Sequence, residues 1–348
     1  MNKLFLGLLL FVPITVLAYT AGVAPTALFF LSALAIVPLA KYIGEATEEL
    51  AGRTNPALGG LLNATFGNAT ELIIGIFALR AGLIEVVKAS ITGSIVGNLL
   101  LVLGTAILFG GWKKNKQTFN ATAAKAAGST LLLAIIALVM PAIFVQSSGA
   151  VSPMVVERLS VIVSIIMILA YLANLWFTLH THKHLYEEEV TKYEPKWSVS
   201  KSVMILFAAT IAVAYMSELL VGAIEPLVLA WGWSEIFIGV IFIAIIGNAA
   251  EHASAITVAL KNRMDLALQI SIGSAIQIAM FAAPMLVLSS FFFTTHMPLV
   301  FNTFELAAII LSVFIVNAVA EDGESNWFEG VQLLAAYAII AVAFFFHP

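Results

Sequence analysis

The sequence has no cysteine and very little charge. Only 10% of its 348 residues are Asp, Glu, Lys or Arg, against roughly a quarter in soluble domains. Without cysteine, disulfide bonds and thiolate metal sites are excluded. The chain has no long tract of Lys and Arg that would indicate nucleic-acid binding, and no HExxH or GxSxG motif that would indicate a hydrolase. It therefore lacks the usual marks of a soluble enzyme or a nucleic-acid-binding protein.

Apolar residues dominate what is present. They make up 61% of the chain, with a mean hydropathy of +1.03, which is more apolar surface than a soluble fold can bury. Eleven apolar segments can be marked, at residues 3–20, 25–43, 57–79, 88–110, 121–145, 154–180, 201–224, 236–260, 266–293, 299–320 and 327–346. Most of them reach the ~20 residues that a helix needs to cross a bilayer. We therefore expect an all-α polytopic membrane protein with about eleven transmembrane helices.

The basic residues are distributed unevenly between the two sides of such a bundle. With eleven crossings, 13 of the 16 Lys and Arg residues fall on one side and 3 on the other. The positive-inside rule then places the N-terminus in the cytoplasm and the C-terminus outside, with the cell membrane as the expected location. Residues 3–20 also fit a signal peptide, because Lys3 precedes a short apolar run. We interpret this segment as a membrane helix.

A five-residue word with a carboxylate occurs twice in the middle of apolar segments. GNATE ends at Glu71, and GNAAE ends at Glu251, 180 residues later. A charge near the bilayer midplane costs roughly 2.5 kcal/mol or more, so an intramembrane carboxylate is a functional candidate by default. The alternative is a pair of glutamates that only holds the bundle together. Two copies of one word at equivalent depth favour a functional site.

The offset of 180 residues extends beyond this word. Gly93-Ser94 aligns with Gly273-Ser274, and the fifth apolar segment aligns with the tenth. Segments two to six thus match segments seven to eleven, with the first segment left over. Because five is odd, the second copy enters the membrane from the opposite side. Inverted repeats of this kind are typical of secondary transporters, whose substrate site lies at the midplane between the repeats.

The repeat divides the chain into four parts. Residues 1–23 form an extra N-terminal transmembrane helix, 24–181 the first five-helix repeat, 182–200 an acidic cytoplasmic linker and 201–348 the second five-helix repeat. The linker carries four glutamates among lysines within residues 187–194. It is a solvated connection or, as an alternative, a regulatory or ion-attracting helix.

Glycines accompany the repeated word. Gly67 and Gly247 directly precede the asparagines, where a glycine can loosen the helix and free carbonyl oxygens for an ion. Gly93 and Gly97 form a GxxxG pattern, for which close helix packing is the favoured interpretation.

The spacing within the word determines its chemistry. Asn68 and Glu71 are three residues apart, as are Asn248 and Glu251, so each pair lies on one helix face. Two opposed faces would offer two carboxylates and two amide oxygens, which suit Ca²⁺, whereas Zn²⁺ or Cu²⁺ would need more His or Cys. When the cation leaves, two close negative charges in a low dielectric favour proton uptake. Competition between Ca²⁺ and H⁺ for one site amounts to antiport.

Six further polar residues are candidates for the surroundings of the site or for its access paths: Glu45, Glu218, Gln277, Ser94, Ser274 and His252. Glu45 and Glu218 belong to related stretches near opposite faces, where they serve the two access paths or cap helix ends. Gln277 is a buried amide that needs a partner. The serines can instead bond to their own helices, and His252 is either a helper of Glu251 or an ordinary helix residue.

Several stretches together resemble a known family. GNATE, GNAAEH, GEATEEL from Gly44, GSAIQIAMF from Gly273 and DGESNWFEG from Asp322 are similar to motifs of the calcium/proton exchanger branch of the calcium/cation antiporter superfamily. The resemblance implies ten core helices in two inverted repeats, an extra N-terminal helix and alternating access. It also implies that Glu71 and Glu251, beside the asparagines of the two words, exchange Ca²⁺ for protons. Sodium/calcium exchangers share the fold but usually carry Ser/Thr and Pro before the acidic residue, and here the Pro is missing, which favours protons.

Other functional classes are weaker alternatives. A cation channel could use the glutamates as a selectivity ring, but one midplane site in an inverted repeat favours a carrier. An intramembrane hydrolase would need a nucleophile and a base, or a metal-activated water. We expect no enzyme activity, no cofactor and no nucleic-acid partner, with Ca²⁺, H⁺ and the lipid bilayer as the partners. Assembly into a homo-oligomer is left open by the sequence.

Overall fold

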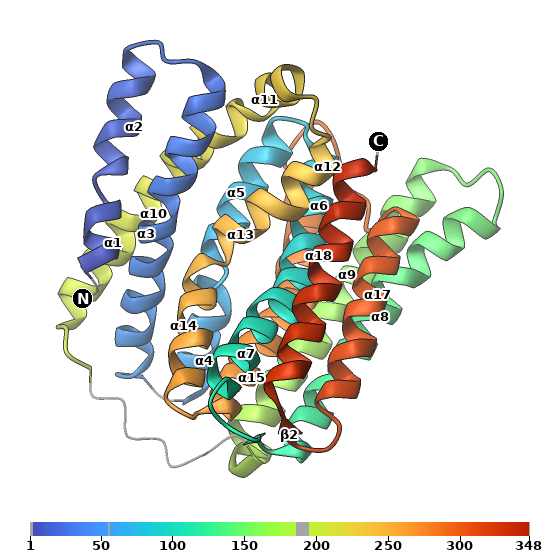
Figure 1. Cartoon of the computed structure of the whole chain (residues 1–348). Helices are drawn as coiled ribbons and strands as arrows, with labels where there is room; N and C mark the ends of the chain where they lie inside the picture. The colour runs from blue at the N-terminus through green and yellow to red at the C-terminus, as the bar shows by residue number, and fades with distance from the viewer. Residues whose placement is uncertain (1–2, 55, 186–194, 348) are drawn as a thin grey trace.

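The computed structural model describes residues 3–54, 56–185 and 195–347. Within these residues the fold is helical apart from one antiparallel pair of two-residue strands, β1 (Gln117–Thr118) and β2 (Glu324–Ser325) (Figure 1). The acidic stretch 187–194 of the predicted linker lies outside the described residues.

The first half of the chain begins with two short helices and continues with longer ones. Its elements are α1 (Lys3–Leu8), α2 (Phe11–Thr20), α3 (Pro25–Ala51), α4 (Pro56–Phe66), α5 (Ala69–Arg80), α6 (Ile84–Val96), the π-helix η1 (Gly97–Val102), α7 (Leu103–Gly111), α8 (Ala121–Ser147), α9 (Pro153–Trp176), the π-helix η2 (Phe177–Thr181) and the 3₁₀ turn η3 (Lys183–Leu185). The predicted segment 3–20 is two helices rather than one. Pro13 explains the break, because it has no N–H to donate to the preceding turn and its ring crowds that turn.

The second half repeats this plan with more interruptions. Its elements are α10 (Val199–Gly222), α11 (Ile224–Trp231), α12 (Glu235–Phe237), the π-helix η4 (Ile238–Ile243), α13 (Ala244–Gly247), α14 (Ala249–Leu260), α15 (Met264–Gln277), the π-helix η5 (Ile278–Ala282), α16 (Ala283–Ser290), α17 (Thr303–Val319) and α18 (Trp327–Phe346). Each of the π-helices η1, η4 and η5 continues directly from a helix and leads directly into the next one.

The helices are those of a membrane protein. Among the described residues, seven helical stretches are long and apolar enough to cross a bilayer, and the bent pair from Glu235 to Leu260 makes eight if it counts as one span. Shorter apolar helices cover Phe5–Thr20 and Thr303–Val319. The predicted all-α polytopic fold is confirmed, whereas the predicted count of eleven crossings is not established by helix length.

Local sequence sets several of the helix ends. Asn302 with Glu305 starts α17, and Asn326 with Glu329 starts α18. In each of these capping boxes the Asn side chain accepts from a first-turn N–H, and the Glu side chain accepts from the Asn N–H. These bonds satisfy backbone donors that have no partner within the helix.

The two helical segments that carry the repeated word run in opposite directions, as an inverted repeat requires. In Figure 1, α4 lies at the lower end and α5 above it, whereas α12 lies at the top and α14 below it. Glycines allow close approach nearby: a Cβ on Gly93 would lie 2.0 Å from the Val240 carbonyl oxygen, and one on Gly239 2.6 Å from the Ala89 Cβ. The packing role predicted for Gly93 is confirmed. The same role for Gly97 is wrong, because a Cβ there would meet nothing within 4 Å.

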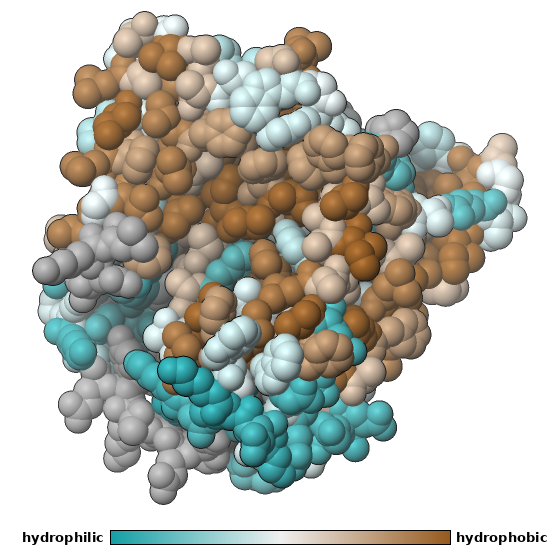
Figure 2. All heavy atoms as spheres, viewed as in Figure 1, coloured by the Kyte–Doolittle hydropathy of each residue, from teal (hydrophilic) through white to brown (hydrophobic). Residues whose placement is uncertain are grey.

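The two ends of the bundle differ. We call the end where α3 finishes, α10 begins and the β1–β2 pair lies the linker end. There Arg53 donates to the carbonyl oxygens of Pro195 and Trp197, and the Glu49 carboxylate accepts from the Trp197 N–H (2.9 Å). These bonds tie the end of α3 to the start of α10. Hydrophilic side chains gather at the lower part of the molecule in the view of Figure 2, and apolar side chains cover most of the helices above.

Candidate functional site

Both copies of the repeated word interrupt a helix at the same place. Helix α4 ends just before Gly67 and α5 begins after Asn68, while α13 ends at Gly247 and α14 begins after Asn248. The two asparagines have nearly the same non-helical backbone, with φ −102° and ψ 20° in the first and φ −91° and ψ 13° in the second. The second break bends its span by 58°. The loosening of the helix that we predicted at the glycines is confirmed.

The breaks place each glutamate at a favourable point of its new helix. Glu71 lies in the first turn of α5, and Glu251 lies in the first turn of α14. The positive end of a helix dipole favours a carboxylate in its first turn, and this partly offsets the cost of a charge inside the membrane. The interruption therefore helps to make an intramembrane carboxylate tolerable.

The two words are in direct contact. A Cβ on Gly247 would lie 3.0 Å from Cγ and 3.3 Å from Oε1 of Glu71, so the Glu71 side chain lies against the backbone of the second word. Only glycine leaves this space open. The sequence argument that the two words form one site is thus matched by the geometry.

A network of neutral polar side chains joins the two repeats. Asn68 Nδ2 donates to Gln277 Oε1 (2.7 Å), so the first word is bonded to α15 of the second repeat. Asn248 is bonded in return to α6 and η1 of the first repeat: its Nδ2 donates to Ser94 Oγ (2.8 Å), and its Oδ1 accepts from Asn98 Nδ2 (2.7 Å). Both asparagines are 1% exposed, so these bonds fix them inside the bundle.

Asn98 is a site residue that the sequence analysis missed. It is completely buried, and its Nδ2 also faces Ser274 Oγ at 3.3 Å. An offset of 180 residues pairs Gln277 with Gly97, but the π-helix η1 begins at Gly97 and η5 begins after Gln277. The two amides therefore hold corresponding places with an offset of 179. An amide four residues after Ser94 in an apolar run was the available signal.

Several buried oxygens at this junction accept no hydrogen bond from any described residue. They are both carboxylate oxygens of Glu71, Oε2 of Glu251 and Oδ1 of Asn98. An unsatisfied buried polar atom costs free energy, and more so when it carries charge. A cation or a proton would supply the missing partner. The described residues contain no group of three or more His, Asp or Glu side chains that could hold a metal, so a cation here would rest on two carboxylates and neutral oxygens.

A cavity of about 450 Å³ connects this junction with the linker end. Its lining includes Gly67, Gly247, Glu251, Ser274 and Gln277 from the junction and Lys41, Glu45 and Glu48 from α3. Glu45 lies in an access cavity as we expected, and it also pairs with Lys41 (3.6 Å). Glu48, one turn further along α3, was not singled out from the sequence.

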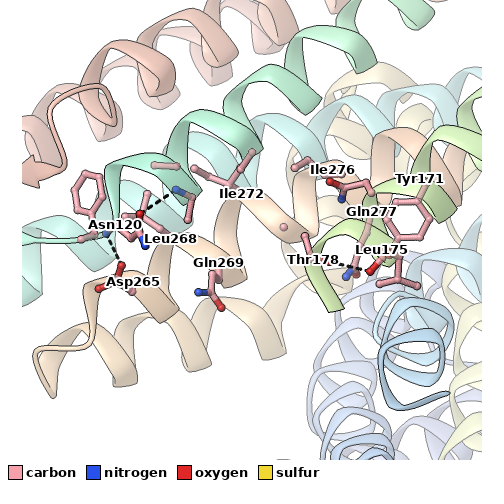
Figure 3. Close-up of a pocket in the computed structure, with 16 residues that line it drawn as sticks. Asn120, Tyr171, Leu175, Thr178, Asp265, Leu268, Gln269, Ile272, Ile276 and Gln277 are labelled. Atoms are coloured by element: carbon pink, nitrogen blue, oxygen red, sulfur yellow. Dashed lines mark hydrogen bonds between the residues drawn. The ribbon is translucent and has the colours of Figure 1, made fainter. Parts of the chain in front are cut away.

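A second, smaller cavity of about 180 Å³ lies on another face of α15, against α8 and α9 (Figure 3). Asn120 and Asp265 lie at one end, where the Asn120 N–H donates to the Asp265 carboxylate (2.6 Å). Gln277 and Tyr171 lie at the other end. Neither glutamate of the repeated word lines this cavity, so it is not the ion site, although Gln277 borders both cavities.

The remaining predicted residues divide into two groups. Ser94, Ser274 and Gln277 belong to the junction, and both serines accept bonds from asparagines. His252 and Glu218 are not among the described residues that line the large cavity. Glu218 is exposed on α10, on the same face as the exposed apolar side chains one and two turns before it. Its role on an access path remains a prediction.

The sequence matches a known family over most of its length. The profile of the family described as Sodium/calcium exchanger protein matches residues 24–180 and 201–346. The chain therefore belongs to this family of membrane cation exchangers. Its two matched stretches fall within the two repeats expected from the sequence.

More specific relatives belong to the calcium/proton branch, as the motifs predicted. The chain is 47% identical over 365 residues to a Ca²⁺/H⁺ antiporter of Synechocystis sp., covering 100% of this chain and 98% of the relative. It is 49% identical over 352 residues to the Ca²⁺/H⁺ antiporter ChaA of Bacillus subtilis, covering 99% of both. The structure of native YfkE superposes with a TM-score of 0.87 at 46% identity, covering 99% of this chain and 100% of that one. The H⁺/Ca²⁺ exchanger CAX, at a TM-score of 0.74 and 14% identity with 99% and 91% covered, shares the fold.

Proposed function

We propose that this protein is a secondary active transporter that exchanges Ca²⁺ for H⁺ by alternating access. The observation that carries the proposal is the contact of the two words at a pair of helix breaks, where carboxylate oxygens of Glu71 and Glu251 lack hydrogen-bond partners. Relatives named Ca²⁺/H⁺ antiporters at 47% and 49% identity support the choice of Ca²⁺ and H⁺ as the two substrates. No enzymatic step and no cofactor is part of this function.

The chemistry of exchange follows from the donor set. Glu71 and Glu251 would bind Ca²⁺ as substrate, and their two charges balance those of the ion. The neighbouring amides provide neutral oxygens of the kind that Ca²⁺ accepts. Without the ion, two carboxylates in a low-dielectric site would take up protons instead. One pair of side chains thus carries either substrate, and the two substrates exclude each other.

The cavity supports a carrier with access from one side at a time. It runs from the junction to the linker end, where Glu45 and Glu48 attract cations. By the positive-inside rule this end faces the cytoplasm, with the N-terminus inside and the C-terminus outside the cell membrane. The inverted arrangement of the repeats provides the complementary state, in which corresponding helices open the opposite path.

Purified protein in proteoliposomes tests this function. A pH gradient should drive Ca²⁺ uptake, and a Na⁺ gradient at equal pH on both sides should not. The difference separates this function from sodium/calcium exchange in a protein of the same family. Ca²⁺ movement driven by Na⁺ at equal pH, or fast Ca²⁺ flux uncoupled from protons, would contradict it.

A further inference from the structure

One fully buried carboxylate lies outside the exchange site. Glu305, near the start of α17, has no exposed surface. Its Oε2 accepts from the Asn302 N–H (3.0 Å) and closes the capping box, while its Oε1 faces the Thr92 hydroxyl of α6 at 3.4 Å. Capping explains one of the two oxygens. It explains neither the complete burial nor the contact with α6, because the corresponding glutamate of α18, Glu329, is partly exposed.

Glu305 continues a row of polar side chains on α6. Glu85, Lys88 and Thr92 follow one another at spacings of three and four residues, so they share one face of that helix. Lys88 Nζ binds Glu85 Oε1 at 2.9 Å, and the Glu85 side chain is 51% exposed, whereas that of Lys88 is 9% exposed. The row therefore runs from the surface into the buried interior.

The row ends beside the exchange site. Ser94, which bonds to Asn248, follows Thr92 by two residues on the same helix, a rise of about 3 Å along the axis. Helix α6 enters the bundle at the end opposite the linker end (Figure 1). The large cavity approaches the site from the linker end, and the row of Glu85, Lys88, Thr92 and Glu305 approaches it from the other.

We propose that Glu305 is a proton-transfer group that connects the exchange site with the outer side of the membrane. This rests on the proposed exchange of Ca²⁺ for H⁺. A water molecule at the outer surface near Glu85 gives a proton to the Glu305 carboxylate, and the neutral acid gives the same proton to water at the opened site, from which Glu71 or Glu251 takes it. The Lys88 ammonium stabilises the Glu305 carboxylate between transfers.

The charged and titratable groups around Glu305 fit this role. Glu85 and Lys88 face it from α6. His347, after the end of α18, stacks on Phe304 with ring centres 4.8 Å apart and is a further titratable group at this end. The contact that α8 makes with the start of α17 is neutral, a bond from Gln146 to Thr303.

Two variants at equivalent cap positions test the proposal. In Glu305→Gln the glutamine can still close the capping box, so the start of α17 is kept while the titratable group is lost. Glu329→Gln makes the same change in the capping box of α18, at the linker end, and is the matched control. Thr92→Val is a second test variant, which leaves the cap untouched and removes the hydroxyl that faces Glu305.

The readout compares two transport modes in proteoliposomes. Ca²⁺/Ca²⁺ exchange at equal pH needs no proton transfer, whereas Ca²⁺ movement driven by a pH gradient does. Glu305→Gln should slow the proton-driven mode roughly tenfold or more and change its dependence on outer pH, with Ca²⁺/Ca²⁺ exchange as in the wild type. Thr92→Val should slow the same mode less, and Glu329→Gln should leave both modes unchanged.

Equal rates of proton-driven transport in Glu305→Gln and wild type would overturn the proposal. So would an equal loss of both modes in Glu305→Gln together with normal proton-driven transport in Thr92→Val, because that pattern indicates a structural role. If wild-type vesicles exchange Ca²⁺ for Ca²⁺ but show no proton-driven flux at all, the proposed function itself fails.

Discussion

The two copies of the repeated word have the same sequence pattern and backbone but different surroundings. Glu71 lies against Gly247, and neither of its buried carboxylate oxygens has a hydrogen-bond partner among the described residues. Glu251 lines the large cavity, and one of its oxygens is buried without a partner. Equivalent residues thus differ in access to the linker end. In an inverted repeat this asymmetry is what a state open to one side requires, and we expect the two glutamates to exchange surroundings in the opposite state.

The largest expected effect comes from removing either charge. Glu71→Gln and Glu251→Gln keep the size of the side chain and one acceptor oxygen but lose the charge and the proton-carrying group. One remaining carboxylate leaves a buried divalent ion with uncompensated charge, which costs several kcal/mol. Each variant should therefore lose Ca²⁺ transport, by roughly a hundredfold or more. Radioactive Ca²⁺ flux and binding are the measurements.

Size-exclusion profiles serve as the control for folding, which should be near normal because each variant resembles a protonated site. Glu→Asp at either position should retain some transport, since the charge stays and only the reach is shortened. Substantial coupled flux from either well-folded Gln variant would rule out the paired-carboxylate mechanism.

A smaller effect is expected from closing the space between the two words. In Gly247→Ala the added Cβ meets the flexible Glu71 side chain at 3.0 Å, so the carboxylate must move away from its place. Ca²⁺ affinity should fall by about tenfold, which corresponds to ~1.4 kcal/mol. Gly222→Ala is the matched control, because a Cβ there meets nothing within 4 Å.

The equivalent change in the first word should behave differently. In Gly67→Ala the Cβ would meet the carbonyl oxygen of Asn63 at 2.4 Å, and a backbone atom cannot give way as a side chain does. Thermal stability should therefore fall together with Ca²⁺ affinity, whereas Gly247→Ala should change affinity with little loss of stability. Equal melting temperatures for the two variants would show that the two glycines are interchangeable.

The amides test whether the two halves of the network are equivalent. Asn98→Ala removes a donor to Asn248, and Gln277→Ala removes the acceptor of Asn68. An unsatisfied buried partner costs about 1–3 kcal/mol, so each variant should weaken Ca²⁺ binding several-fold and by similar amounts. Calorimetric titration with Ca²⁺ measures this. A wild-type affinity in one of the two would show that only the other asparagine is held by its amide partner.

The smallest effects are expected at Glu45 and Glu218. Neutralising either should slow transport a few-fold and alter its pH dependence, while equilibrium Ca²⁺ binding is largely kept, because surface-accessible charges mainly act on ion access. Glu45→Gln removes a charge from the wall of the cavity, whereas Glu218 lies on the exposed face of α10. If Glu218→Gln abolished binding as completely as the Glu71 variant, Glu218 would have to contact the ion.

The sequence predicts the features that depend on local patterns. Apolar run lengths gave the helical membrane fold, and the repeated word located the helix breaks and the contact between the repeats. What it could not predict depends on small changes of helical register. The π-helices shift Asn98 by one residue relative to Gln277, and Pro13 divides the first segment. The direction in which Glu48 or Glu218 points depends on tertiary packing, which no local pattern specifies.

Proton release on Ca²⁺ binding tests the central claim most directly. When purified wild-type protein in weakly buffered detergent solution is titrated with Ca²⁺, protons should be released, because Ca²⁺ displaces them from Glu71 and Glu251. The apparent Ca²⁺ affinity should fall as pH falls, since protons occupy the same carboxylates. The double variant Glu71→Gln/Glu251→Gln should release none. Saturating Ca²⁺ binding to the wild type without proton release, at a pH where a proton gradient drives transport, would contradict the competition of the two ions for one site.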